Sequence, residues 1–295
     1  MIILNGQQID NIEYNGVNLD KVIFNGVIVF EKSTEDNSTT IITITNQDKS
    51  TKTINLRYKV EQPTVYVNGY VRDNQSNAVN YVDTTAGQKS RSFTIPSYST
   101  YVIELSGGKI SEYDEDSSLF LEGNIYTEAF LGTNIESCNG WLIEPECTSL
   151  TIAADLPINI EYAGYLETLT IIGPHVIESI SNLEAYTESL TIPAGSTIES
   201  GAFNSIYEVQ EIHILGSTTV LNSGMINSCY ALENLYVHST VPAATKGQWC
   251  GSSTYPTIHL SSTLNINTAR ELFGSSFNTY KEGRDTLELE VVFDL

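Results

Sequence analysis

The side chains that could carry out chemistry in this sequence are mainly carboxylates, and they are densest in the run Glu112-Tyr113-Asp114-Glu115-Asp116. Carboxylate oxygens bind calcium, and paired carboxylates hydrolyse glycosidic bonds. An EF-hand loop starting at Asp114 would place Leu119 at its required glycine and Ile125 at its bidentate glutamate, so this motif fails. We interpret the run as a solvated acidic loop, with a weak calcium site as the alternative.

Cysteine and histidine form two Cys-x8-His pairs, Cys229 with His238 and Cys250 with His259. Zinc ligands usually lie closer together, as in Cys-x2-4-Cys or His-x3-5-His. The four side chains also fall at different positions of the repeat described below, so we do not expect them to converge. We therefore predict no metal site and no cofactor.

Motifs of enzymes are missing from the sequence. It has no G-x-S-x-G elbow, no phosphate-binding glycine loop and no His-Glu-x-x-His motif. No pair of carboxylates can be placed together at the separation that glycoside hydrolysis needs. We assign no catalytic residue and expect a protein that is not an enzyme.

Short strand-like segments recur about every 20 residues in the C-terminal half of the sequence. Any functional side chains there must be positioned by these strands. Each is a triplet with apolar outer residues and a polar or amphipathic middle residue, as expected when one strand face is buried. Because one repeat cannot bury its own apolar face, the triplets must stack as a solenoid. The units at 169 and 190 are short, and we expect irregularity there. The six triplets are Leu150-Thr151-Ile152, Leu169-Thr170-Ile171, Leu190-Thr191-Ile192, Ile212-His213-Ile214, Leu235-Tyr236-Val237 and Ile258-His259-Leu260.

Apolar residues upstream of the triplets keep the same register. They form columns 14, nine and three residues before the first triplet residue. The columns contain Ile198 and Leu221; Ile160, Phe203, Ile226 and Trp249; and Leu166, Val209, Leu232 and Tyr255. We expect Trp249 to belong to the core, because it shares a column with Phe203 and Ile226.

Three aromatic side chains, His213, Tyr236 and His259, occupy the outward-facing middle position of three successive triplets. They should form one contiguous ladder across neighbouring strands. An ordinary solvated sheet face is the simpler interpretation. A binding strip is the alternative, and this ladder is the best candidate for it in the sequence.

The repeats resemble a known family. The pattern Ile198-x4-Phe203-x5-Val209-x2-Ile212-x-Ile214, with its companion at 223–237, is similar to the leucine-rich repeats of BspA-type bacterial surface proteins. The resemblance covers residues 148–260 and implies a leucine-rich-repeat fold with an adhesive or binding function. Several turns lack the family's usual Ala-Phe pair.

A second, shorter period occupies residues 1–30, where Asn5-Gly6, Asn15-Gly16 and Asn25-Gly26 recur every ten residues between apolar runs. Asn-Gly favours type I′ hairpin turns, which predicts a tight β-meander. A meander this small is marginal alone, so we expect it to attach to a partner. It resembles short N-terminal segments of bacteriophage virion proteins, which implies attachment to other capsid or tail proteins through these residues.

The rest of the chain divides by composition into a polar linker at 31–39 and a β-rich segment at 40–106, followed by the solenoid with its caps. Alternating strands at 41–45, 53–60, 65–71, 92–95 and 101–105 suggest an immunoglobulin-like spacer, although the Cys-Trp-Cys signature is missing. Ser106-Gly107-Gly108 should end the last of these strands. We expect an N-terminal cap at 107–147, the solenoid at 148–262, and a cap or strand at 263–295. The fold class is therefore mainly β.

Charge and hydropathy exclude several functions. A net charge of −22 argues against binding nucleic acid, which needs clustered Lys and Arg. No apolar segment is long enough to span a membrane, and the N-terminus does not read as a secretory signal. Four cysteines, Cys138, Cys147, Cys229 and Cys250, are too few for a disulfide scaffold and leave the redox state open.

These observations predict a non-enzymatic bacteriophage virion protein, such as a head fibre, decoration or tail-fibre subunit. It would be made in the host cytoplasm, released by lysis, and bind a host surface glycan or protein through the repeats. By resemblance such fibres are usually homotrimers, although no heptad pattern here specifies three chains. The alternatives are a bacterial surface adhesin or polysaccharide-binding protein, and a carbohydrate-active enzyme using Asp114, Glu115 and Asp116.

Overall fold

The structure is a computed structural model that is mainly β, with no helix among the residues that it describes. These are residues 3–4, 7–8, 12–14, 17–19, 21–24, 27–31, 38–111, 113, 125–136, 147–161, 166–181, 188–216, 219–222, 224–238, 243–244, 256–262, 291–293 and 295.

Three antiparallel hairpins occupy the start of the chain. They pair β1 (Ile3–Leu4) with β2 (Gln7–Gln8), β3 (Ile12–Tyr14) with β4 (Val17–Leu19), and β5 (Lys21–Phe24) with β6 (Val27–Glu31). In each hairpin the innermost partners, such as Leu4 and Gln7, directly flank one Asn-Gly dipeptide. The strands therefore pair around the predicted dipeptides, but they form three separate two-stranded sheets and not the one continuous meander that the sequence predicted. The dipeptides themselves lie outside the described residues.

An antiparallel sheet follows, with strand order β10-β8-β11-β7 and β9 paired to β8. Two of the predicted strands are one long strand, β8, and one strand, β9, was not predicted. The apolar face of this sheet closes around Phe93, which is fully buried and lies 5.8 Å from the ring of Tyr81 and 6.1 Å from that of Tyr101. The strands are β7 (Thr40–Asn46), β8 (Lys52–Val71), β9 (Val79–Asp83), β10 (Gly87–Ile95) and β11 (Ser99–Ser111).

The predicted strand end at Ser106-Gly107-Gly108 is wrong. Strand β11 continues to Ser111 and shifts register against β8 between Gly107 and Ile110. Glycine makes this crossing feasible, because a Cβ at Gly108 would overlap the carbonyl oxygen of Gln62. The two glycines therefore allow a close approach of two backbones instead of ending the strand.

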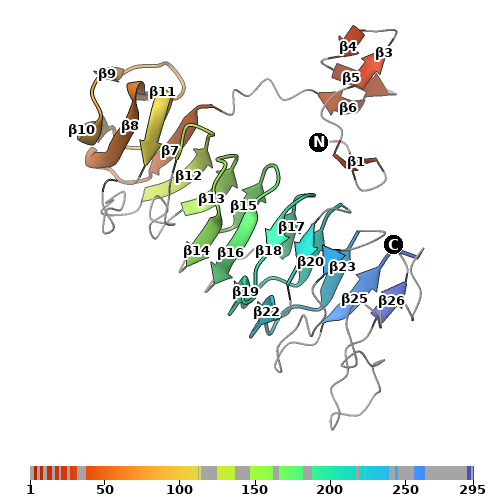
Figure 1. Ribbon diagram of the computed structural model, residues 1–295. Coiled ribbons are helices and arrows are strands. Elements are labelled where there is room, and N and C mark those ends of the chain that lie inside the picture. The colour runs from red at the N-terminus through yellow and green to blue at the C-terminus, as the bar shows by residue number, and fades with distance from the viewer. Residues whose placement is uncertain are drawn as a thin grey trace.

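The antiparallel sheet continues directly into the repeats (Figure 1). Strand β12 (Ile125–Leu131) pairs antiparallel with β7 and parallel with β13 (Cys147–Ile152), which pairs parallel with β15 (Thr168–Ile171). A buried network of hydrogen bonds stabilises the region where antiparallel pairing changes to parallel pairing. Thr40 donates to Asn134 Oδ1 over 2.7 Å, and Asn134 Nδ2 donates to the Leu105 carbonyl over 3.0 Å. One sheet of eight strands thus joins both parts of the molecule.

The remaining triplets form a parallel, in-register sheet with order β17-β20-β23-β25-β26. All six predicted triplets are strands, and every outer apolar residue is at most 8% exposed, which confirms the predicted period and its buried face. Strand β26 extends the sheet beyond the last predicted triplet by pairing with β25. The new strands are β17 (Ser189–Ile192), β20 (Glu211–Ile214), β23 (Asn234–Val237), β25 (Thr257–Leu260) and β26 (Val291–Phe293).

A second sheet of parallel strands packs behind the triplets and confirms the upstream columns. Ile198 pairs with Leu221 and Phe203 with Ile226, and all four are fully buried. Trp249 and Tyr255 lie outside the described residues. The strands are β14 (Ile158–Glu161), β16 (Val176–Ser181), β18 (Thr197–Ile198), β19 (Phe203–Asn204), β21 (Val220–Leu221), β22 (Ile226–Asn227) and β24 (Ala243–Ala244).

The triplet strands are divided between two sheets, one ending at β15 and the other starting at β17, which is the irregularity expected for the short units. The back sheet bridges the division, because β16 pairs with β14 on one side and with β18 and β19 on the other. His175 supports this region from inside. Its ring nitrogens lie 2.9 Å from the Leu156 carbonyl oxygen and 3.0 Å from that of Ile172.

The crossing at Gly108 gives a stability test. We expect Gly108→Ala to lower the free energy of unfolding by about 3 kcal/mol or more, since the new methyl group can be placed only if two backbones separate. Gly87→Ala is the matched control. A Cβ there meets nothing within 4 Å, so only its φ of +107° opposes the change, at about 1 to 2 kcal/mol. Urea denaturation measures both, and equal losses would contradict the proposed crossing.

Candidate functional site

The predicted ladder exists as a stack of rings. His213 on β20, Tyr236 on β23 and His259 on β25 are register partners on consecutive strands. The centroids of His213 and Tyr236 are 4.4 Å apart with ring planes at 6°, and those of Tyr236 and His259 are 4.4 Å apart at 22°. The geometry of the ladder is therefore confirmed, while its role in binding stays a prediction.

Sequence reasoning missed the side chains that flank this stack. His238 Nε2 lies 3.1 Å from His213 Nδ1, and Glu211 Oε2 lies 3.4 Å from His213 Nε2. Asn234 Oδ1 lies 3.1 Å from His259 Nε2. The alternation of side chains along a strand could have revealed them, because residues two positions apart lie on the same face of a strand. We call these six residues the ring cluster: Glu211, His213, Asn234, Tyr236, His238 and His259.

The stacking decides what the ring cluster can offer a ligand. Parallel rings 4.4 Å apart cover one another's faces, so ring edges with their nitrogen and hydroxyl groups are what remain for contact. The cluster is half-buried, with His213, Tyr236 and His259 neither fully exposed nor in the core. It can therefore provide a row of hydrogen-bonding groups on a rigid sheet.

Burial sets the electrostatics of the cluster. The pKa of His238 lies below its usual value of 6.5, first because burial disfavours the charged ring and second because His213 is close enough to repel a positive charge. The shared hydrogen bond between Nδ1 of His213 and Nε2 of His238 fits a pair in which at least one of these two nitrogens carries no proton.

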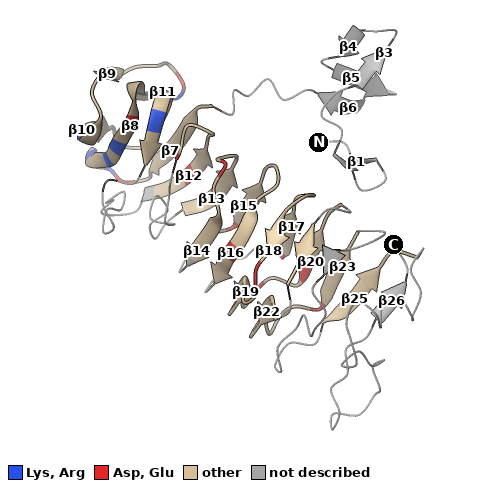
Figure 2. Ribbon diagram, viewed as in Figure 1, with Lys and Arg blue, Asp and Glu red and all other residues tan. Residues whose placement is uncertain are grey.

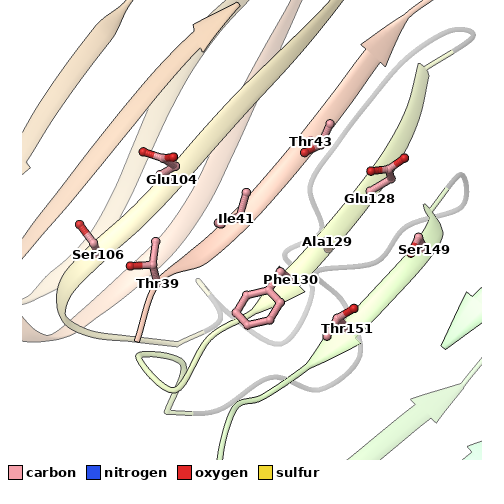
Figure 3. Close-up of a pocket in the computed structure, with 10 residues that line it drawn as sticks. All are labelled: Thr39, Ile41, Thr43, Glu104, Ser106, Glu128, Ala129, Phe130, Ser149 and Thr151. Atoms are coloured by element: carbon pink, nitrogen blue, oxygen red, sulfur yellow. The ribbon is translucent and has the colours of Figure 1, made fainter. Parts of the chain in front are cut away.

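A hollow of about 440 Å³ opens on the face of the sheet opposite the core, where the antiparallel strands meet the first repeat (Figure 3). We call it the junction hollow. Its side chains come from four adjacent strands, β11, β7, β12 and β13, and from Thr39 just before β7. They combine two carboxylates, five hydroxyl groups, Ile41 and the ring of Phe130. The lining residues are Thr39, Ile41, Thr43, Glu104, Ser106, Glu128, Ala129, Phe130, Ser149 and Thr151.

Lys and Arg are unevenly distributed along the chain. Figure 2 shows Lys and Arg on the antiparallel strands around β8 and β11, whereas Asp and Glu are scattered along the repeats. The sequence contains no Lys or Arg between Lys109 and Lys246. The repeats therefore present an acidic surface, which disfavours anionic ligands.

The Cys and His residues that suggested zinc do not share one site where they are described. Cys229 is buried in the core and its thiol lies near the Phe203 carbonyl oxygen, whereas His238 belongs to the ring cluster on the outward face. Burial raises the pKa of the thiols of Cys147 and Cys229, that of Cys147 to about 11. In the described part of the chain no group of three or more His, Cys, Asp or Glu side chains is arranged so that it could hold a metal ion.

Other sequence candidates fall outside the described residues. These are Asp114, Glu115 and Asp116 of the acidic run, Cys138 and Cys250. Within the described ranges no helix is long and apolar enough to cross a membrane.

Comparison of the chain with family models, with curated proteins and with solved structures gives no match. The function must therefore be argued from the ring cluster, the junction hollow and the sheets that position them.

Acid should weaken the fold through His238. Because its pKa in the folded chain lies below 6.5, the unfolded chain binds more protons as the pH falls through that value, and the free energy of unfolding declines. We expect His238→Gln to reduce this decline between about pH 7.5 and pH 5.5. Urea denaturation at both pH values measures it. Thr191→Gln, an exposed change on the same face that removes no titrating group, is the control, and an identical decline in both variants would contradict the assignment.

Proposed function

We propose that the chain is a non-enzymatic structural protein of a bacteriophage virion that binds a host surface through the outward face of its repeats. The ring cluster is the observation that carries this proposal. Side chains from three neighbouring strands are held in one row by in-register parallel pairing, which minimises the entropy lost when a ligand is bound.

Rigidity supports a binding role over a catalytic one. The ring cluster contains a single carboxylate, Glu211, and it has no nucleophile beside a base. What it offers is a fixed array of donors and acceptors, which suits recognition of a polar surface such as a host glycan or protein.

The hairpins at the start of the chain support the attachment part of the proposal. An isolated two-stranded hairpin is marginally stable at best in water, and in the described residues no strand of the large sheets pairs with these three. We propose that residues 1–30 bind other virion proteins of the capsid or tail, with copies of the chain assembled as a homo-oligomer. The immunoglobulin-like assignment of 40–106 and the BspA-type assignment of the repeats belong to this proposal.

The same ring cluster also fits a bacterial surface adhesin or a polysaccharide-binding protein. That second candidate differs in location and not in binding chemistry, so location is the discriminating measurement. No described feature favours the carbohydrate-active enzyme.

Binding can be tested with the purified chain and host cells. We expect Tyr236→Ala to reduce adsorption by about tenfold, because it removes the central ring and unstacks both histidines. Tyr98→Ala is the matched control, since Tyr98 is 66% exposed and lies in the antiparallel part. Flow cytometry of the labelled protein provides the readout. Equal adsorption by the two variants would refute a role for the ring cluster.

Attachment can be tested in phage particles. We expect deletion of residues 1–30 to abolish incorporation into density-purified particles, as measured by mass spectrometry, while the thermal transition of the repeats is retained. Replacing residues 32–37 with a Gly-Ser segment of equal length should leave incorporation intact. If the full chain is found only in cell envelopes, the adhesin replaces the virion protein as the proposed function.

A further inference from the structure

We propose that the junction hollow is a second binding site, separate from the ring cluster, and that it takes a neutral saccharide. The hollow lies on the same outward face as the ring cluster but at the other end of the repeats. Its volume of about 440 Å³ falls within the range of roughly 300–1,000 Å³ usual for small-ligand sites.

Strand register places the lining side chains in rows across the sheet. Glu104, Ile41 and Phe130 are consecutive partners on β11, β7 and β12, and Thr151 on β13 continues the row. In the next row Thr43 on β7 is the partner of Glu128, which pairs in turn with Ser149. Ile41 and Phe130 thus lie side by side between polar residues in the first row, the second row is entirely polar, and backbone hydrogen bonds fix both rows.

Two neighbours hold the polar groups of the floor in place. Tyr70 donates its hydroxyl hydrogen to Glu104 Oε1 over 2.8 Å, and Arg72 donates from Nη2 to Thr43 Oγ1 over 3.0 Å. A preorganised carboxylate accepts hydrogen bonds from ligand hydroxyl groups without losing further side-chain entropy. The hydroxyl groups of Thr39, Ser106, Ser149 and Thr151 add both donors and acceptors.

Phe130 supplies the apolar surface that a sugar ring requires. Its side chain is half-buried at the edge of the hollow between β7 and β13 (Figure 3). None of the ring–ring contacts in the described residues involves Phe130, in contrast to the rings of the ring cluster, which cover one another. A half-exposed phenyl ring beside hydroxyl and carboxylate groups is complementary to a pyranose, which has an apolar face and a hydroxylated edge.

Charge selects the class of saccharide. Two carboxylates, Glu104 and Glu128, line the hollow, and Arg72 is the one cation that contacts a lining residue among those described. The two carboxylates outnumber this single cation, and the sequence has no Lys or Arg between Lys109 and Lys246 that could pair with a uronic acid or sialic acid. The hollow should therefore favour sugars without acidic groups.

The two carboxylates are arranged for binding and not for cleavage. They stand on β11 and β12, on either side of β7, and neither is in the core, since Glu128 is exposed and Glu104 half-buried. A general acid of a glycosidase needs burial to keep its proton at neutral pH.

The test uses the full-length chain and two matched sets of probes. The first set is the neutral trisaccharides of glucose, galactose, mannose and N-acetylglucosamine, and the second is the trisaccharides of glucuronic and galacturonic acid. Saturation-transfer NMR and calorimetry measure binding. We expect at least one neutral trisaccharide to bind and the acidic set to bind about tenfold more weakly or not at all.

Variants locate the site. Phe130→Leu keeps the apolar volume but removes the ring, and Glu128→Gln removes a charged acceptor, so each should weaken binding by about tenfold. Tyr126→Ala and Glu136→Gln are matched controls, because both residues are exposed, near the hollow in sequence and not part of its lining. Unchanged thermal transitions show that the variants fold.

Several results would overturn the inference. They are the failure of every neutral trisaccharide to bind, equal binding of the acidic set, or binding that survives Phe130→Leu. Binding that is lost in Tyr236→Ala but not in Phe130→Leu would assign the sugar to the ring cluster. That outcome refutes the site in the junction hollow while supporting the proposed function, so the two failures are distinguishable.

Discussion

The whole arrangement depends on the burial of two apolar side chains per triplet against the back sheet. A strand such as β20 places Ile212 and Ile214 on one face. This face is shielded from water only if β17 and β23 lie beside β20 in the same register. A slip by one residue would bury His213 and expose both isoleucines. The constraint that stabilises the solenoid therefore also fixes which side chains line its outer face.

The antiparallel part protects the first edge of this solenoid. A terminal parallel strand exposes unpaired backbone groups and one side of its apolar layer. Here β12 has both partners, β7 on one side and β13 on the other, and the buried pair of Thr40 and Asn134 closes the turn region. At the opposite end β26 covers β25. The junction hollow results from the way β12 covers the first edge, because it forms where antiparallel and parallel strands share one face of the sheet.

Much of the fold and of the ring cluster could be predicted from the sequence. The features that the sequence did not predict were missed for physical reasons. The period of the triplets, their buried residues and the stack of His213, Tyr236 and His259 follow from local alternation and spacing. Gly107 and Gly108 were misjudged because glycine equally allows a turn or the close approach of another backbone, and only the position of Gln62 decides between them. The hollow was missed because Glu104 and Glu128 meet on one face only through β7, some 60 residues before Glu104. Contacts between strands so distant in sequence leave no local signal.

The division between β15 and β17 has a consequence for how the two surfaces work together. The hollow belongs to one hydrogen-bonded sheet and the ring cluster to another, yet β16 of the back sheet bridges them with strands on both sides. Their separation is thereby set by a rigid support and not by a linker. A polymer long enough to reach both would bind the second surface at a high effective concentration, and its avidity would exceed the affinity of either surface alone. A short fragment of the same polymer would gain nothing from this geometry, so chain length itself would become a determinant of recognition.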